Sequence, residues 1–259
     1  MKRFFVEPWQ IGETQIQIVG KDVNHIRNVL RMKPGDTLWI SDKEKKEYNC
    51  LIDTITEEEI LLRIVYVQES DFELPSRLIL FQCLPKGDKM EWIIQKAVEL
   101  GVWEIVPVAS SRCVVRLDEK KAAKKVERWQ QIAESAAKQS KRLKIPRIHP
   151  VLSFAEALAC AENCPVKLIP YEMEKDMRGT GALLRSLEPG QDVAIFIGPE
   201  GGFSPEEVQA AMEAGVRPIT LGKRILRTET AGLAILSVLM FQLEEKMCQE
   251  EDEDGSIFR

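Results

Sequence analysis

The stretch FIGPEGGFSPEE, residues 196–207, decides the fold of this chain. An apolar run, VAIFI at 193–197, precedes its three glycines, and this order is typical of a buried strand that ends in a loop with exposed backbone. Ser204 is placed as a helix N-cap, with Pro205 at the first helical position and Glu207 completing a capping box. The stretch therefore predicts a strand, a glycine-rich loop and a helix. In open α/β sheets ligands bind beside such loops, at the carboxyl ends of the strands.

The same alternation of strand and helix recurs before and after this stretch. LILFQCL (78–84) reads as an apolar strand, and the next apolar residues recur at helical spacing until Gly101, where VWEIVPV (102–108) begins a second strand. Two more short strand candidates are VKLIP (166–170) and RPITLG (217–222). Strands that alternate with helices indicate a parallel sheet, so we expect an α/β fold for this part of the chain.

The first 70 residues or so follow a different pattern, with several short β segments and one helical piece at 22–32. Many short strands indicate a small β-barrel. The pattern changes around SDFELPS (70–76), where we place a domain boundary. We therefore expect a barrel at 1–72, an α/β domain at 73–247 and an acidic tail at 248–259.

Charge is distributed unevenly along the chain. The net charge of −5 is accounted for by residues 244–259, which hold seven acidic and two basic side chains. Residues 112–147, in contrast, carry twelve Lys or Arg against four Asp or Glu. This segment has two equal interpretations: a surface that binds nucleic acid, or a solvated helix face with i,i+4 ion pairs.

Composition excludes several classes of protein. No apolar run reaches the length of about 18 residues that a membrane span requires, and we expect a cytoplasmic protein. The six cysteines and two histidines lack zinc-ligand spacing, so we expect no metal. GPEGG matches neither the Walker A pattern nor the GxGxxG of dinucleotide-binding proteins, and Glu200 would repel a phosphate.

A second signal is LGKRILRTETAGLAIL, residues 221–236, in which a polar loop precedes an apolar helix expected at about 231–243. By itself this helix predicts a core or dimer role. Together with GPEGGFSPEE, the stretch LGKRILRTETA resembles the SPOUT superfamily of S-adenosylmethionine-dependent RNA methyltransferases, specifically the family that methylates N3 of a uridine in 16S ribosomal RNA. The same family is resembled in order and spacing by RFFV near the N-terminus, by HIRNVLRMKPGD (25–36), by KGDKMEWIIQKAVELGV (86–102) and by ERWQQIAESAAKQSKR (127–142).

The resemblance covers nearly the whole chain, and only the acidic tail after Glu244 departs from it. It implies a PUA-like β-barrel, then an α/β SPOUT domain with a C-terminal trefoil knot. It also implies a homodimer that acts on 16S ribosomal RNA within the small ribosomal subunit. S-adenosylmethionine would bind among three loops. The residues carried over for cofactor binding are Pro170, Tyr171, Glu172, Ile197, Gly198, Pro199, Glu200, Gly201, Gly202, Leu221, Gly222, Ile225, Leu226, Arg227, Thr230 and Ala231.

For catalysis, the motif positions indicate Arg227 as the group that stabilises an anionic uracil, with Glu229 or Glu200 as a base or orienting group. An Arg227–Glu229 ion pair that only fixes the loop is nearly as well supported. For RNA binding we expect Arg3, His25, Arg27, Arg31, Lys138, Lys141 and Arg142, although the apolar neighbours of His25 favour a packed core histidine.

Three alternatives remain open at this point. They are another SPOUT activity, such as ribose 2′-O or guanine N1 methylation, a noncatalytic RNA-binding protein of ribosome assembly, and a nicotinamide oxidoreductase. The missing GxGxxG argues against the last of these.

Overall fold

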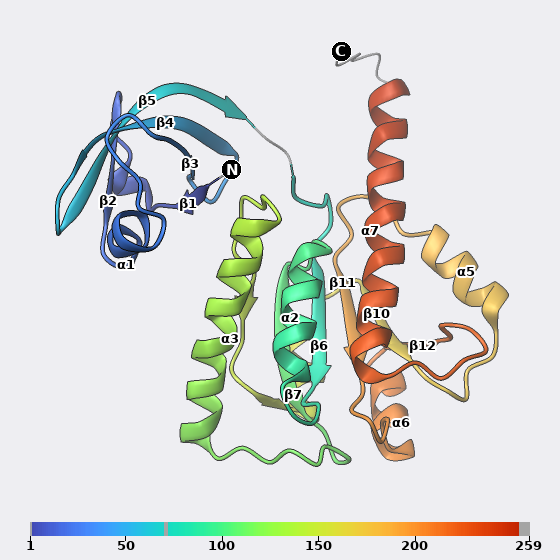
Figure 1. Cartoon of the computed structure of the whole chain (residues 1–259). Coiled ribbons are helices and arrows are strands. Elements are labelled where there is room, and N and C mark those ends of the chain that lie inside the picture. The colour runs from blue at the N-terminus through green and yellow to red at the C-terminus, as the bar shows by residue number, and fades with distance from the viewer. Residues whose placement is uncertain (1, 70–71, 254–259) are drawn as a thin grey trace. The chain divides into compact units, whose positions relative to one another are not determined.

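The computed structural model describes residues 2–69 and 72–253, and side chains as far as residue 249 (Figure 1). The chain divides into two compact units. Unit 1 comprises Met1–Glu73 and Ala137–Ile145, and unit 2 comprises Leu74–Ala136 and Pro146–Arg259. The sequence placed 137–145 in the second domain, whereas their contacts group them with unit 1.

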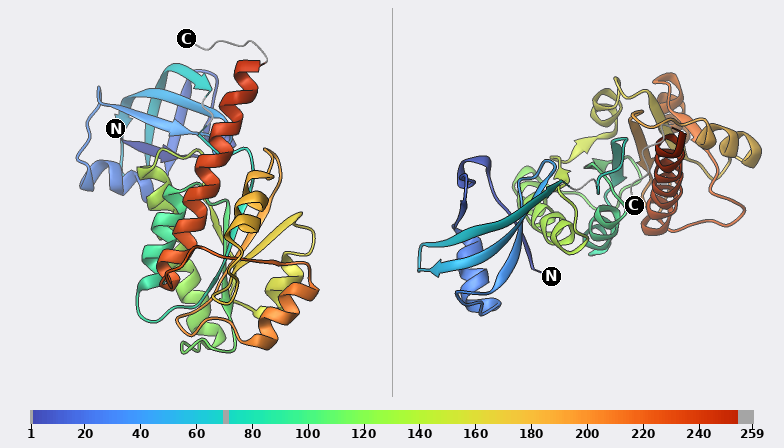
Figure 2. Two further views of the ribbon diagram at one scale, coloured as in Figure 1. Left: turned by 90° about the vertical axis from the view of Figure 1, so that its right-hand side faces the viewer. Right: turned by 90° about the horizontal axis from the view of Figure 1, so that it is seen from above.

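Unit 1 is built on a five-stranded sheet with the strand order β1-β3-β4-β5-β2. Strand β1 runs parallel to β3, and the other neighbours are antiparallel. Irregularities of register between β4 and β5 bend both strands, and Figure 2 shows the resulting curl. Among the described strands β1 and β2 remain the two edges, so the sheet is curled where the sequence predicted a barrel. Its elements are β1 (Arg3–Phe5), η1 (Pro8–Gln10), β2 (Gln15–Val19), α1 (Lys21–Asn24), η2 (His25–Val29), β3 (Thr37–Ser41), β4 (Lys46–Ile55) and β5 (Glu59–Glu69).

The core of unit 1 follows the two-residue period of its strands. Alternate residues such as Ile16 and Ile18 on β2, or Ile60 and Leu62 on β5, are almost fully buried on the concave side. The turns α1 and η2 cover this cluster with Val23 and Ile26. The side chain of His25 itself is exposed, with its ring edge-on to Phe4 at 5.9 Å between centroids, so the expectation of a core histidine is wrong.

Unit 2 contains a seven-stranded sheet in which every recorded pair is parallel. The order is β12-β10-β11-β6-β7-β8, with β9 beside β7. The chain first builds outward from β6 to β8 and then returns to the other side of β6, so the order reverses there. Its elements are β6 (Leu78–Cys83), α2 (Lys89–Glu99), β7 (Glu104–Ala109), α3 (Glu119–Gln139), β8 (Arg147–Ile148), β9 (Leu152–Ser153), α4 (Phe154–Cys160), β10 (Val166–Pro170), α5 (Met177–Arg185), β11 (Val193–Ile197), α6 (Pro205–Glu213), β12 (Arg217–Ile219) and α7 (Thr228–Glu253).

Local chemistry explains where these elements begin and end. The Ser204 side chain accepts a hydrogen bond from the backbone of Glu207 and the reciprocal bond is also present, so the predicted capping box starts α6. After α2, Gly101 adopts a φ of +85°, a left-handed conformation that ends the helix. The predicted basic helix is α3, which buries Trp129 and Ala133 against unit 2.

The last helix, α7, is longer than predicted. It begins at Thr228 and ends at Glu253, against an expected 231–243, so it includes the first half of the expected acidic tail. Residues 254–259 of that tail lie outside the described residues. In Figure 1, α7 and α2 lie side by side, and α7 also contacts β6 and β11. Over the described ranges, no helix is both long enough and apolar enough to cross a membrane.

Candidate functional site

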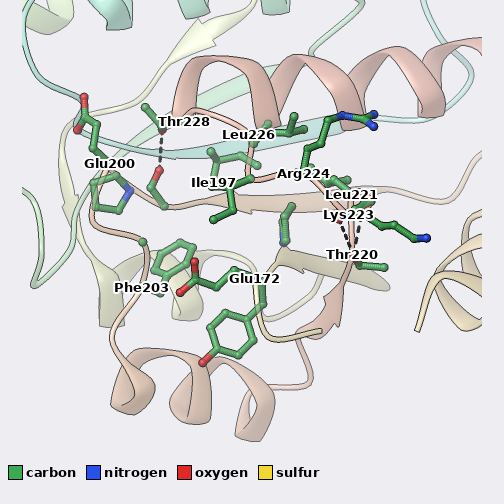
Figure 3. A pocket seen from close by; sticks show the side chains of 18 residues that line it. Glu172, Ile197, Glu200, Phe203, Thr220, Leu221, Lys223, Arg224, Leu226 and Thr228 are labelled. Atoms are coloured by element: carbon green, nitrogen blue, oxygen red, sulfur yellow. Dashed lines mark hydrogen bonds between the residues drawn. The ribbon is translucent and has the colours of Figure 1, made fainter. Parts of the chain in front are cut away.

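Three loops at the carboxyl ends of β10, β11 and β12 surround one cavity in unit 2 (Figure 3). These strands are neighbours in a parallel sheet, so the loops that follow them emerge at the same edge. The cavity is lined by Pro170, Tyr171, Glu172, Ile197, Gly198, Pro199, Glu200, Gly202, Phe203, Thr220, Leu221, Gly222, Lys223, Arg224, Ile225, Leu226, Thr228 and Ala231.

The structure brings most of the expected cofactor-binding residues to this cavity, but three of them do not line it: Gly201, Arg227 and Thr230. Five residues that the sequence analysis did not name do line it: Phe203, Thr220, Lys223, Arg224 and Thr228. All five lie within or next to the two quoted motifs. Four of them belong to the motifs themselves, and only Thr220 lies outside, directly before the second motif.

Phe203 supports the glycine loop from behind. Its ring packs against Phe154 of α4 at 5.3 Å between centroids, and Phe154 in turn contacts Phe196 of β11. A Cβ added to Gly198 would meet the Phe203 ring at 3.2 Å. A side chain at position 198 would therefore force the Phe203 ring or the nearby backbone of Gly202 to shift.

A buried hydrogen-bond relay ties the glycine loop to the start of α7. The side-chain amide of Gln82, at the end of β6, donates to the Thr228 hydroxyl at 2.9 Å. That hydroxyl donates to the Gly198 carbonyl at 2.6 Å (Figure 3). Gln82 is fully buried and Thr228 is 5% exposed, so water competes little for the bond between them. The relay fixes the position of Gly198 relative to β6 and to the first residue of α7.

Lys89, in the first turn of α2, joins two of the predicted catalytic carboxylates. Its Nζ lies 3.0 Å from Oε1 of Glu200 and 3.1 Å from Oε2 of Glu229. Burial raises the pKa of each carboxyl and is the largest single influence, but hydrogen bonds from backbone amides and from Lys89 outweigh it, so both pKa values are lowered. The pKa of Lys89 is raised mainly by its hydrogen bond to Glu200 and next by its hydrogen bond to Glu229. Both carboxylates are thus ionised at neutral pH, and a lowered pKa makes them weak proton acceptors.

Arg227 is exposed, and within the part of the chain that the structure describes its side chain has no hydrogen bond or ion pair. The expected ion pair with Glu229 is replaced by the one between Glu229 and Lys89, although the charge of Arg227 still helps to lower the pKa of Glu229. The backbone carbonyl of Arg227 accepts bonds from Thr230 and Ala231 and so begins α7. Gly201 does not line the cavity, and its carbonyl accepts a hydrogen bond from Arg112 at 3.0 Å.

Two of the expected RNA contacts are structural residues of unit 1. Arg3 is 7% exposed and pairs with Glu47, which is fully buried. Arg142 is 4% exposed and pairs with Glu73, whose carboxylate also accepts bonds from the backbone of residues 143 and 144. Because both guanidinium groups are enclosed with an acidic partner, they present no surface to an RNA phosphate. The prediction for Arg3 and Arg142 is corrected accordingly.

The other expected RNA contacts reach the surface of unit 1 to different degrees. His25, Arg27, Arg31 and Lys141 are exposed, and the guanidinium of Arg27 lies 3.1 Å from the exposed carboxylate of Glu57. Lys138 is partly buried, with its ammonium 3.2 Å from Asp22 and 5.3 Å from the centre of the Phe4 ring. His25, Lys138 and Phe4 thus form one contact group.

Comparison with known proteins connects this arrangement to a family. A family model described as an RNA methyltransferase domain matches residues 72–240, and one described as an RNA methyltransferase PUA domain matches residues 18–65. The chain belongs to this RNA methyltransferase family. A relative from Bacillus subtilis, named ribosomal RNA small subunit methyltransferase E, is 38% identical over 94% of this chain and 98% of its own length. A protein of the same name from Mesomycoplasma hyopneumoniae is 35% identical over 92% of this chain and 98% of its own length.

Solved structures of similar methyltransferases share the whole fold. A ribosomal RNA small subunit methyltransferase E from Neisseria gonorrhoeae, bound to S-adenosyl methionine, has a TM-score of 0.80 and 34% identity over 93% of this chain and 97% of its own. A putative methyltransferase from Legionella pneumophila, solved in complex with the same cofactor, has a TM-score of 0.80 and 34% identity over 92% of this chain and 96% of its own. The fold of this methyltransferase is therefore α/β, with a small curled sheet preceding a parallel sheet.

Proposed function

We propose that this protein transfers a methyl group from S-adenosylmethionine to N3 of a specific uridine in 16S ribosomal RNA of the small ribosomal subunit. One observation carries the proposal: the three loops of the two quoted motifs surround a single cavity in a chain that aligns over 94% of its length with a ribosomal RNA small subunit methyltransferase E. The catalytic unit is expected within residues 73–247 and an RNA-binding unit within 1–72.

The cavity fits S-adenosylmethionine. Gly202 and Gly222 line it with φ values of +65° and +110°, and a Cβ built on either one meets no atom within 4 Å, so a side chain there would occupy open space. Leu221, Ile225 and Leu226 supply an apolar wall, and Ile225 is 86% exposed. A wall of this kind suits a nucleobase, while the backbone beside the glycines offers hydrogen bonds to its polar edge. The chain can approach the ribose and methionine parts closely only if these positions carry no Cβ, which glycine satisfies.

When bound, S-adenosylmethionine supplies an activated methyl group, so the chain needs no covalent nucleophile. The task of its residues is to hold a flipped-out uridine with N3 aligned to that methyl group. Arg227, exposed next to the cavity-lining Leu226 and Thr228, is the proposed group for stabilising negative charge on the uracil as the N3 proton leaves. Glu200 and Glu229 are the proposed orienting groups, since their ion pairs with Lys89 hold both carboxylates in place and their lowered pKa values make them weak bases.

We assign RNA binding to the exposed side chains of His25, Arg27, Arg31 and Lys141 in unit 1 and to the solvent-exposed basic face of α3. Lysine and arginine contact phosphates without reading sequence, so binding should weaken steeply with salt. Specificity then comes from the shape of the RNA and from the flipped base.

We also propose that the protein is a cytoplasmic homodimer whose C-terminal part is knotted. The dimer is supported by exposed apolar side chains on the adjacent helices α2 and α7, where Trp92, Val238 and Phe241 are 47%, 49% and 66% exposed. The knot is supported by the path of α7, which returns from the edge strand β12 to contact β6 and β11. Light scattering at assay concentration tests the dimer, and a monomer of 29.5 kDa would refute it.

The test of the function is methyl transfer from labelled S-adenosylmethionine to small subunits that lack their natural modifications, followed by reverse transcription across the RNA. Methylation of N3 blocks base pairing, so the expected result is label together with a new stop at one uridine. Label without a stop indicates ribose methylation, and a stop at a guanine indicates N1 methylation. Absence of label together with absence of cofactor binding would overturn the proposal in favour of an RNA-binding assembly factor.

A further inference from the structure

Lys89 connects three elements that the chain places far apart in sequence. It lies in the first turn of α2, whereas Glu200 belongs to the loop after β11 and Glu229 to the first turn of α7. The backbone amide of Lys86 donates a further bond to the same Glu200 oxygen, at 3.1 Å. Glu200 is therefore held from two directions by the segment 86–89, and its carboxylate is fixed relative to α2.

Lys89 contributes to the cavity without being part of its wall. Glu200 lines the cavity, and Glu229 follows directly on the cavity-lining Thr228, whereas Lys89 is not among the lining residues. Two carboxylates that share one ammonium group would repel one another if that group were absent. The loop and the first turn of α7 would then separate, and both carry parts of the cavity wall.

We propose that Lys89 is a positioning residue for cofactor binding, which fixes the glycine loop and the N-terminus of α7 by holding Glu200 and Glu229 together. This inference rests on the proposed function, because it concerns the affinity of the same cavity for S-adenosylmethionine. It assigns a role to the segment KGDK, residues 86–89, to which the motif analysis gave none. Glu200 and Glu229 then act through geometry, and neither contributes a base.

The experiment compares K89M, K89R and a matched control, K96M. Lys96 is also on α2, with 36% of its side chain exposed against 32% for Lys89, and it pairs with Glu99 at 2.8 Å on the same helix. The affinity for S-adenosylmethionine is measured by calorimetry and the methylation kinetics with subunits as substrate. K89M is expected to weaken cofactor binding about three- to tenfold, the effect of losing two linked ion pairs of partial exposure. K89R should stay within about twofold of wild type, and K96M should be unchanged.

The change should appear in the KM for S-adenosylmethionine more than in kcat, because Lys89 touches the cavity wall and not the reacting atoms. A second measurement is the pH dependence of the affinity for S-adenosylmethionine, which would not change in K89M if Lys89 only stabilised the fold. The charged groups that face one another here are Lys89, Glu200, Glu229 and Arg227. Without Lys89 the pKa of each carboxyl rises, and protonation of either carboxyl removes the repulsion between them, so the affinity of K89M should increase on acidification. In wild type, acidification breaks the ion pairs to Lys89, so its affinity should fall.

A double-mutant cycle keeps the inference testable if K89M proves unstable. In an E200Q/E229Q background the substitution K89M should cause no further loss of affinity, because the lysine acts only through those two side chains. The inference is overturned if K89M binds the cofactor as wild type does, or if K89M weakens binding in the E200Q/E229Q background as much as in wild type. A wild-type protein that does not bind S-adenosylmethionine would instead refute the proposed function.

Discussion

Replacing Thr228 by valine tests whether the buried relay from Gln82 to Gly198 holds the cofactor loop. Valine matches the shape of threonine but removes the hydroxyl, which accepts from the Gln82 amide at 2.9 Å and donates to the Gly198 carbonyl at 2.6 Å. One Gln82 N–H then loses its partner in a fully buried position, while the other Gln82 bond, to the Cys83 carbonyl, is retained. The Gly198 carbonyl is partly exposed and can turn to water.

The magnitude follows from these two groups. An unsatisfied buried donor costs about 1–3 kcal/mol, and the Gly198 carbonyl adds less because water reaches it. We therefore expect Thr228→Val to lower the free energy of unfolding by about 2 kcal/mol. In a chain of this size that is a fall in Tm of roughly 4–8 °C. Because Thr228 and Gly198 both line the cavity, the affinity for S-adenosylmethionine should fall as well.

The matched control is Thr228→Ser, which keeps the hydroxyl and removes one methyl group at a cost of about 0.8 kcal/mol. Denaturant unfolding gives the stabilities, and calorimetry gives the cofactor affinities. The reasoning is refuted if the valine variant is as stable as the serine variant and binds the cofactor equally well, because the hydroxyl would then contribute nothing that shape does not.

Three further predictions concern other residues. Glu73→Gln leaves the buried guanidinium of Arg142 without its charged partner and should destabilise unit 1 by on the order of 3 kcal/mol in denaturant unfolding. The control Glu188→Gln removes an ion pair whose carboxylate is 57% exposed and should change stability little. Equal effects of the two substitutions would contradict this reasoning. Gly202→Ala places a residue with a side chain at a φ of +65° and should lower the free energy of unfolding by about 1–2 kcal/mol. In Gly201→Ala the new Cβ meets Arg112 at an ordinary contact distance of 3.5 Å, so the free energy of unfolding should hardly change. Denaturant unfolding of both variants is the test. Arg227→Ala should lower turnover about 10²-fold or more with little change in cofactor affinity, and unchanged turnover in single-turnover methylation would remove Arg227 from the mechanism.

The sequence predicts those features of the fold that are decided locally. A capping box at Ser204 and a left-handed glycine at position 101 fix where helices begin and end, because they satisfy backbone groups within a few residues. The parallel sheet follows from the alternation of strands and helices. The loops that follow the predicted strands at 166–170, 193–197 and 217–222 could therefore be assigned to one edge of the sheet before any contact was known. Only the family resemblance indicated that these loops bind the cofactor.

Electrostatic pairing could not be predicted in the same way, because each pair joins distant parts of the chain. Arg3 and Arg142 belong to segments rich in basic residues, and a charge pattern does not distinguish a solvated arginine from one enclosed with Glu47 or Glu73. The segment 137–145 joins unit 1 through such contacts, including the bonds that Glu73 accepts from its backbone. The continuous basic pattern of 112–147 gave no sign of this division.

The same limit explains how the roles in the candidate site change between sequence and structure. Motif position indicated Arg227 as the group that stabilises an anionic uracil and left Glu229 and Glu200 open as a base or an orienting group. The ion pairs of Lys89 distinguish the two carboxylates from Arg227. Lys89 binds both carboxylates, although each lies more than one hundred residues away in the sequence. Arg227 keeps an exposed side chain that, among the described residues, has no bonding partner. A positive charge left available beside a cavity can respond to negative charge that develops on a substrate, whereas a carboxylate already paired with lysine is held in place and is a weak base.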